Sequence, residues 1–138
     1  MNCEEIFEFI RREHLALGDC VVIMFVGTGG KFDTRVSFVG VEGDAIVVLI
    51  GGRKVSIPCN SINSIQRCFN SCEEVFQSIR RERLAPLDCI VIVSEVFGEI
   101  GREVKFFHVT NDDVVVFIGA REVSIPCNSI KSIRRCSK

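Results

Sequence analysis

Apolar residues follow two spacings along this chain, first a helical one and then a strand-like one, and this order occurs twice. Residues 4–17 carry Ile6 and Ile10 on one narrow apolar stripe among charged residues, which is typical of an amphipathic helix. We expect this helix to end at Gly18. We expect its second copy to end at Pro86, because the residue before a proline leaves the helical region.

Short runs rich in β-branched residues follow each helix and predict five strands per copy. In the first copy the expected strands are 20–26, 35–41, 45–50, 54–57 and 61–66. In the second copy they are 89–93, 103–109, 114–118, 122–125 and 129–134. A glycine-rich turn at 27–30 follows the first strand, and Pro58 and Pro126 end the fourth strands. The pattern predicts a mainly β fold with one N-terminal helix per copy, each copy a bent, partly open five-stranded barrel of the SH3 or Sm kind.

The chain consists of two copies of one unit. Residues 55–62 (VSIPCNSI) return unchanged at 123–130. A fixed internal period defines the folding unit, here of about 65 residues, and two copies are too few for a solenoid. We therefore predict two tandem domains, 1–68 and 72–138, joined by the short link 69–71.

Charge balance and apolar content limit the classes of function. The chain has 138 residues, of which 47% are hydrophobic, with 17 basic and 18 acidic side chains. A general nucleic-acid binder usually carries a basic excess, so nucleic-acid contact here requires a local basic patch. No apolar run approaches the roughly 20 residues that span a bilayer, and the acidic start at Glu4 and Glu5 is unlike a signal peptide. We expect no membrane association and a cytoplasmic location.

Eight cysteines occupy matching places in the two copies. They are Cys3, Cys20, Cys59 and Cys68, followed by Cys72, Cys89, Cys127 and Cys136. No CxxC spacing occurs, which argues against a zinc ribbon and a thioredoxin-like motif. In a reducing compartment we expect free thiols that act as small buried apolar residues, matched because the unit was duplicated. We expect no metal and no cofactor.

Several short runs match the motifs of a known family. They are FQSIRRERL at 76–84, IGGRKV at 50–55, IGAREV at 118–123 and NSIKSI at 128–133. The first resembles the arginine-rich first helix of the Sm/LSm family, the next two its Sm2 turn, and the last the beginning of its final strand. Each copy is similar to the family from end to end, and most of all to the bacterial RNA chaperones called Hfq.

The resemblance implies two RNA sites, of which one keeps its residues. The family's uridine pocket uses a Lys-His pair, but Cys59 and Asn60 stand there in the first copy, and Cys127 and Asn128 in the second. The stacking aromatic residue, worth roughly 1–3 kcal/mol per base, is also missing. The rim site keeps its arginines, which would contact phosphate, although such a run is also typical of an ordinary solvated face. They are Arg11, Arg12, Arg80, Arg81 and Arg83.

Sm-like domains form rings by strand addition at exposed sheet edges. Six domains complete an Hfq ring, so we expect a homotrimer of this two-domain chain, with RNA as its partner. The alternative is that the two barrels pair with each other inside one chain. In the ring, the resemblance implies that six residues face the pore: Cys3, Cys59, Asn60, Cys72, Cys127 and Asn128.

The resemblance also implies which cysteines are neighbours. The expected neighbours are Cys20 and Cys68, Cys89 and Cys136, Cys3 and Cys59, and Cys72 and Cys127. Paired thiols of this kind bind a soft metal or form disulfides, and both uses stand as alternatives to the free thiols expected above.

No constellation of residues in the chain points to catalysis. There is no Ser-His-Asp order, no phosphate-binding glycine motif and no paired acids, so we expect no enzyme and no catalytic residue. His14 aligns with Arg83 and is expected at the surface. His108 has no counterpart in the first copy, where Gly40 aligns with it, so we expect a structural or exposed role.

Three functions therefore stand as hypotheses. The first is RNA binding through the helix-rim arginines. The second is a self-assembling structural or coat-like module without nucleic acid, favoured by near-zero net charge and many cysteines. The third is a metal-responsive ring. Basic residues at the end of the second copy make that copy the better candidate for polyanion contact: Lys131, Arg134, Arg135 and Lys138.

Overall fold

The computed structural model describes residues 2–27 and 30–136. Thr28 and Gly29 of the predicted glycine-rich turn, and Lys138 of the basic end, lie outside these residues. The chain divides into two compact units, Met1–Cys68 and Phe69–Lys138. Phe69 stands in the predicted link, but it packs against the core of the second unit.

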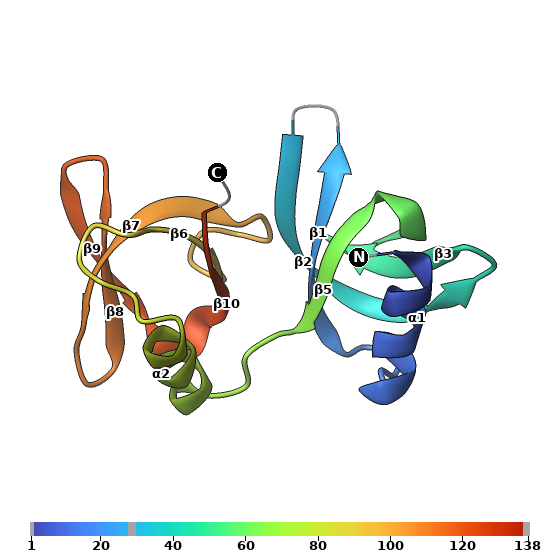
Figure 1. Ribbon diagram of the computed structural model, residues 1–138, viewed down its shortest axis with the longest axis horizontal. Coiled ribbons are helices and arrows are strands. Elements are labelled where there is room, and N and C mark those ends of the chain that lie inside the picture. The colour runs from blue at the N-terminus through green and yellow to red at the C-terminus, as the bar shows by residue number, and fades with distance from the viewer. Residues whose placement is uncertain (1, 28–29, 137–138) are drawn as a thin grey trace. The chain divides into compact units, whose positions relative to one another are not determined.

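Both units contain the same succession of elements (Figure 1). The first unit consists of α1 (Cys3–Arg12), β1 (Cys20–Gly27), β2 (Gly30–Glu42), β3 (Ala45–Ile50), β4 (Arg53–Pro58), the 3₁₀ turn η1 (Cys59–Ser61) and β5 (Ile62–Arg67). The second consists of α2 (Cys72–Arg81), β6 (Cys89–Ser94), β7 (Arg102–Val109), β8 (Asp113–Ile118), β9 (Arg121–Pro126), η2 (Cys127–Ser129) and β10 (Ile130–Arg135). The mainly β architecture with one helix per copy is confirmed.

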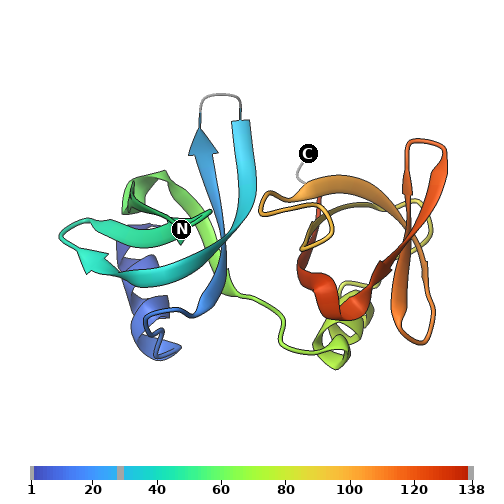
Figure 2. The same ribbon diagram turned by 180° about the vertical axis from the view of Figure 1, so that it is seen from behind.

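Each unit forms one antiparallel five-stranded sheet. The strand order is β4-β3-β2-β1-β5 in the first unit, and the corresponding β9-β8-β7-β6-β10 in the second. Strand β2 pairs with β1 near its start and with β3 near its end, and its register shifts between Phe38 and Gly40. A bulge increases local bending and twist, and the long strand is visibly curved from both sides (Figures 1 and 2).

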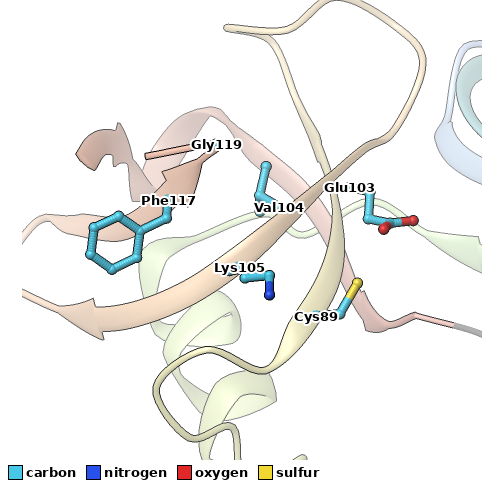
Figure 3. A pocket seen from close by; sticks show the side chains of 6 residues that line it. All are labelled: Cys89, Glu103, Val104, Lys105, Phe117 and Gly119. Atoms are coloured by element: carbon cyan, nitrogen blue, oxygen red, sulfur yellow. The ribbon is translucent and has the colours of Figure 1, made fainter. Parts of the chain in front are cut away.

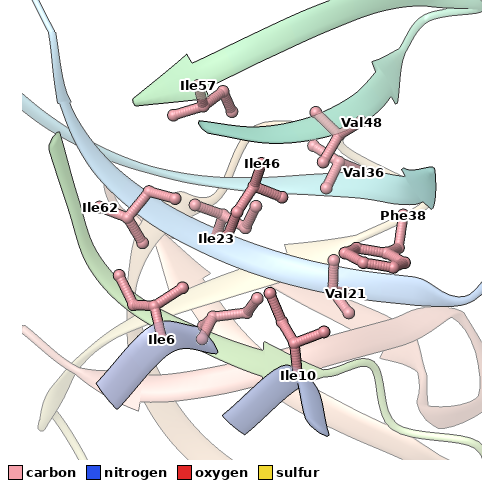
Figure 4. Packing of buried hydrophobic residues seen from close by; sticks show 11 residues of the cluster. Ile6, Ile10, Val21, Ile23, Val36, Phe38, Ile46, Val48, Ile57 and Ile62 are labelled. Carbon is pink, nitrogen blue, oxygen red and sulfur yellow. The ribbon is translucent and has the colours of Figure 1, made fainter. Parts of the chain in front are cut away.

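Eleven buried apolar residues form each core, and they occupy matching positions in the two units. In the first unit Ile6 and Ile10 point from α1 toward the strands (Figure 4). Val75 and Ile79 take their places on α2. The apolar stripe thus docks the helix as the sequence predicts, because residues four apart lie on one face of a helix.

The helix N-termini are capped as their residues suggest. The Asn2 side chain accepts a hydrogen bond from the Glu5 N–H at 2.8 Å, and the Glu5 carboxylate accepts from the Asn2 N–H at 3.1 Å. This reciprocal pair is a capping box. In the second unit the Ser71 hydroxyl accepts from the Glu74 N–H at 3.3 Å. These caps set the helix starts.

The predicted helix ends were wrong. The first helix ends at Arg12 rather than near Leu17, because His14 adopts a left-handed backbone with φ of 52°. The Leu15 N–H then bonds back to the Ile10 carbonyl at 3.2 Å, which closes a Schellman motif. Arg83 has the same φ of 52° in the second unit. Because neither residue is glycine, the sequence carries no obvious stop signal at this point.

Candidate functional site

The predicted rim arginines lie at the C-terminal ends of the two helices. Arg11 and Arg12 lie in the last turn of α1, and Arg80 and Arg81 lie in the last turn of α2. Arg83 comes just after α2 and is the residue with the left-handed backbone. All of these side chains are exposed. Positive charge here stabilises the helix dipole by about 0.3–1 kcal/mol per residue. The arginines therefore have a local role in addition to any contact with a partner.

One rim arginine has visible side-chain partners. Arg12 carries its guanidinium carbon 5.7 Å from the centroid of the Phe9 ring, and its Nε lies 3.9 Å from a Glu13 oxygen. Its side chain keeps 64% of its surface exposed, so the guanidinium still faces solvent. Exposed pairs of this kind contribute at most about 1 kcal/mol. They position Arg12 without neutralising the surface around it.

An arginine at the end of the last strand of each unit contacts the end of the helix. The sequence pattern did not predict this role. In the second unit Arg135 donates to the Glu82 carbonyl at 2.7 Å and the Arg83 carbonyl at 3.2 Å, and it pairs with Asp88 at 3.1 Å. Helix C-termini leave carbonyls without intrahelical partners. The Nη2 of Arg135 donates to both of these carbonyls, while its Nη1 donates to Asp88. We call this arrangement the arginine clamp.

The first unit repeats the clamp with Arg67. Its guanidinium donates to the Glu13 carbonyl and pairs with the Asp19 carboxylate at 3.5 Å. The Asp19 carboxylate also accepts from the Ala16 N–H at 2.9 Å, as Asp88 accepts from Ala85 at 2.8 Å. The matching positions of Arg67 and Arg135 were the available signal, but their contacts cross more than fifty residues.

The pKa of Asp88 lies below its ordinary value. The hydrogen bond from the Ala85 N–H is the largest cause that holds the pKa of Asp88 below its ordinary value. Partial desolvation opposes this effect, and the hydrogen bond and charge of Arg135 reinforce it. The aspartate is therefore a structural anion that fixes the loop between helix and first strand.

These contacts change the interpretation of the basic end of the second copy. Arg135 was predicted to contact a polyanion, but its guanidinium is used inside the unit. Lys131 is also engaged, because its Nζ lies 3.2 Å from a Glu95 carboxylate oxygen. Arg134 donates to the Arg135 carbonyl at 3.0 Å. The exposed arginines at the helix ends remain the better candidates for a polyanion contact.

The expectation of free thiols was wrong, because all eight cysteines form disulfides. The pairs are Cys3–Cys59, Cys20–Cys68, Cys72–Cys127 and Cys89–Cys136, with Cα–Cα distances of 5.1 to 5.5 Å. These are the neighbours that the resemblance implied, and those placements are confirmed. Small domains bury little of their surface, and disulfides compensate for this by constraining the unfolded chain.

The two bonds of each unit have different positions. Cys3–Cys59 joins the start of α1 to η1, and Cys20–Cys68 joins the start of β1 to the end of β5. The first bond fixes the helix on the sheet, and the second closes the β1–β5 pair. The even cysteine number and the matched positions in a small unit were the signals for this frame.

The six predicted pore residues fall into two groups. Cys59 and Cys127 are buried, at 2% and 3% exposure, and both are disulfide-bonded to the helix cysteines, Cys3 and Cys72. Those four residues offer no thiolate in this state, so the metal-responsive ring loses its ligands. Asn60 and Asn128 are exposed on the 3₁₀ turns. Whether a pore forms beside them depends on assembly, and that placement stays a prediction.

A small pocket of about 170 Å³ lies on the outer face of the second sheet (Figure 3). Cys89 and Glu103 line one end and Phe117 the other (Figure 3). Lys105 is the cross-strand partner of Cys89. The first unit has Arg35 at the register position of Glu103, since Arg35 pairs with Val22 and Glu103 with Val91. The pocket walls thus belong to the part of the unit where the two copies differ.

The two histidines do not join any of these groups. His14 is exposed at the end of α1, as expected. His108 is exposed on β7, where its ring stacks edge-on against Phe107 at 4.6 Å between centroids. Its Nδ1 lies 3.3 Å from the Val109 carbonyl oxygen. This backbone contact and the ring stacking give His108 a local structural environment rather than one that prepares proton transfer.

Comparison with family models, with curated proteins and with solved structures gives no match for this chain. Neither helix, among the residues that the structure describes, has the length and apolar character required to cross a bilayer. The candidate site therefore depends on the chain's own geometry, in which exposed arginines lie at the two helix ends.

Proposed function

We propose that this chain is a non-enzymatic, oligomeric, Sm-like binding module. The order of elements supports this proposal: each unit has an N-terminal helix, five strands and a 3₁₀ turn between the fourth and fifth strands. The same order is what the resemblance to the Sm/LSm family implies. The identical runs 55–62 and 123–130 supply the fourth strand and the turn in both units.

The observation that carries the proposal is the pair of sheet edges in each unit. The sheets end at β4 and β5 in the first unit and at β9 and β10 in the second. Within the described parts of the chain, the outer side of each edge strand has no strand partner. An open edge is a template for strand addition. Three chains supply six such units and close a pseudo-hexameric ring.

The proposed partner of the ring is RNA, held by its phosphates at the helix ends. Arg80, Arg81 and Arg83 give the second unit three exposed guanidinium groups within four residues. Guanidinium groups hold phosphate in a planar, bidentate geometry. The contact would be independent of base sequence, since phosphate carries no base information.

Size-exclusion chromatography with light scattering, read at 260 and 280 nm, tests the assembly and the ligand together. The chain has no Trp and no Tyr, so bound nucleic acid dominates the absorbance. We expect the mass of a trimer, with nucleic acid on the protein as purified. A monomer without nucleic acid would contradict both parts of the proposal.

A triple variant tests the arginines themselves. Replacing Arg80, Arg81 and Arg83 by alanine should weaken single-stranded RNA binding. It should also reduce the salt slope of log K by about 0.7 for each phosphate that the protein no longer neutralises. The control replaces Arg102 and Lys105, which are also exposed but lie on the inner strand β7. Equal losses in both variants would show a general charge effect and would contradict a rim site.

The second candidate is a self-assembling structural module without nucleic acid. The four disulfides favour it, because a covalently fixed frame suits a durable protein of near-zero net charge. Disulfides persist in oxidising compartments and in the cells of hyperthermophiles, so they weigh against an ordinary reducing cytoplasm. Assemblies larger than six units that contain no nucleic acid would favour this candidate over the ring.

A further inference from the structure

One cluster outside the proposed binding surface has the composition of a metal site. The sulfur atoms of Cys89 and Cys136 and a carboxylate oxygen of Glu103 all lie within 4.8 Å of one another. Thiolates and a carboxylate are suitable ligands for zinc. In the structure the two sulfurs are joined in a disulfide, so they are not yet free to act as thiolates.

We propose that the Cys89–Cys136 disulfide is a redox-controlled site for a thiophilic divalent cation such as Zn²⁺. A dithiol reductant supplies two electrons and two protons, so the S–S bond breaks and two thiols form while the reductant becomes a disulfide. The cation then displaces both thiol protons and forms two metal–sulfur bonds and one bond to the Glu103 carboxylate. A small-molecule disulfide reverses the sequence: it accepts two electrons from the two thiolates and becomes two thiolates itself, the S–S bond re-forms, and the cation is released.

The local geometry favours this exchange. Both cysteines are partly exposed, whereas every other disulfide of the chain includes a buried cysteine or one fixed to the 3₁₀ turn. Zn–S bonds of about 2.3 Å in a tetrahedral site require the sulfurs to separate to roughly 3.8 Å. The adjoining pocket gives access to Cys89 and Glu103 and leaves space for a water molecule as fourth ligand.

The neighbouring charges also fit the proposal. Lys105 is the cross-strand partner of Cys89, so its positive charge partly offsets the two thiolates and the carboxylate that would surround the cation. Lysine has no lone pair to offer while it is charged, so it acts on Cys89 without occupying the cation's coordination sphere.

The first unit provides a built-in comparison. Its Cys20–Cys68 disulfide has nearly the same Cα–Cα distance, 5.5 Å against 5.4 Å. Arg35 occupies the register position of Glu103 there, so a cation meets a positive charge in place of a ligand. The two pairs therefore differ in this residue and in burial, since Cys68 is buried and Cys136 is partly exposed. Among the residues that the structure describes, a third ligand lies only beside the second pair.

Site-resolved alkylation tests the proposal on the intact chain. The protein is reduced with a phosphine under anaerobic conditions, incubated with or without Zn²⁺, alkylated with iodoacetamide and analysed by mass spectrometry. We expect Zn²⁺ to slow alkylation of Cys89 and Cys136 at least about tenfold more than that of Cys20 and Cys68. Circular dichroism records the strand content of each sample.

Exchange of the third ligand sharpens the test. Glu103→Gln should lower the Zn²⁺ affinity by about tenfold or more, the loss typical of a disturbed metal site. Arg35→Glu should create matching protection at Cys20 and Cys68. Equal protection of both pairs, or protection unchanged by Glu103→Gln, would overturn the proposal. Reduced protein that loses its strand signal and does not regain it with Zn²⁺ would overturn it as well, because metal binding and folding are coupled.

Discussion

The two units share their interior and differ on their outer face. Eleven core residues of one unit have apolar counterparts in the other, as Ile6 and Val75 or Phe38 and Phe106 illustrate. The two disulfides and the arginine clamp are also present twice. The interior of a small domain is close-packed, and a change of one methylene group already affects its packing. The shared set is therefore what the fold needs.

The first hairpin, unlike the core, differs between the two units. In the first unit β1 runs on to Gly27, whereas β6 ends at Ser94. The Ser94 hydroxyl lies 2.9 Å from the Ser129 hydroxyl, and it accepts from the Val96 N–H at 3.2 Å. Phe25 stands at the matching place and continues the strand opposite Phe32, whereas the pairing of β6 with β7 ends at Ile92 and Arg102. The Ser94 hydroxyl bonds to the backbone two residues later and thus ends a strand that Phe25 continues in the first unit.

The outer face of the middle strands differs in charge and in shape. Glu103 replaces Arg35, and Lys105 replaces Ser37, at equivalent register positions. These side chains are at least partly exposed, so their exchange costs the fold little. The comparison teaches that the interior defines the unit, while the outer face is where the two units have acquired separate properties.

Removal of the disulfide between helix and 3₁₀ turn should have the largest effect. It tests whether the disulfide frames of the two units, each made of two bonds, are equivalent. Replacing Cys3 and Cys59 together by alanine should lower the free energy of unfolding of the first unit by about 4 kcal/mol, within the range of 2–5 kcal/mol for small domains. Replacing Cys72 and Cys127 should lower that of the second unit equally, since the bonds enclose 56 and 55 residues. Denaturant unfolding followed by circular dichroism measures both losses.

Hydrogen exchange assigns each loss to a unit. Faster exchange should be confined to the unit whose bond is missing. Losses that differ by more than about 1.5 kcal/mol, or exchange that rises in both units, would show that the frames are not equivalent.

Much of each unit could be predicted because its signals are local. The stripe of Ile6 and Ile10 predicts the docked helix, and β-branched runs predict the strands, since side-chain alternation and burial act over a few residues. The helix end could not be read in this way. It depends on His14 and Arg83 adopting a conformation that glycine usually provides.

The candidate site could be predicted less fully than the fold. Exposed arginines at a helix end are visible in the sequence, but the clamp requires Arg67 to meet Glu13, which lies 54 residues earlier. The disulfide partners are equally distant along the chain, and their pairing came from the family resemblance rather than from spacing. Contacts between residues far apart in the sequence cannot be predicted until the strand order of the sheet is known.

Loss of the arginine clamp should have the next largest effect. Arg135→Ala should lower the free energy of unfolding of the second unit by about 1–2 kcal/mol, because it leaves the Glu82 and Arg83 carbonyls without their donor. Arg67→Ala should have a similar effect on the first unit. Arg135→Lys is the control, since it keeps the charge but loses the fork. Lysine that restores full stability would show that charge alone matters. Thermal unfolding of the variants measures the effect.

A smaller effect is expected where a leucine in one unit and a glycine in the other adopt the same left-handed backbone. Leu87 has φ of 73° and is 62% exposed, at the position where the first unit has Gly18 with φ of 92°. A left-handed backbone costs a non-glycine residue roughly 1–2 kcal/mol, which the entropy of glycine partly offsets. Leu87→Gly should stabilise the second unit by about 0.5 kcal/mol, and Gly18→Leu should destabilise the first by about 1 kcal/mol.

Leu87→Gly and Gly18→Leu together separate the cost of the left-handed backbone from the effect of side-chain packing. A Cβ added at Gly18 meets no atom within 4 Å, so we expect a loss there to come from the backbone conformation. Denaturant midpoints of the two variants provide the measurement. A loss of stability on Leu87→Gly would mean that the exposed leucine is held by a contact that compensates for its conformation.

The smallest expected effect is the acid sensitivity of the clamp. Because the Ala85 N–H and Arg135 lower the folded-state pKa of Asp88 below 3.8, its contribution to stability is fully present above the unfolded-state value. That contribution is lost as the pH falls through the lowered folded-state pKa. Asp88→Asn should therefore flatten the decline in stability of the second unit below about pH 4.

Carboxyl-carbon NMR on the wild type and on Arg135→Ala separates the two causes of the lowered pKa. Arg135→Ala should raise the pKa of Asp88 only part of the way to its ordinary value, because the Ala85 hydrogen bond is the larger cause. A complete return would instead make the charge of Arg135 the dominant one.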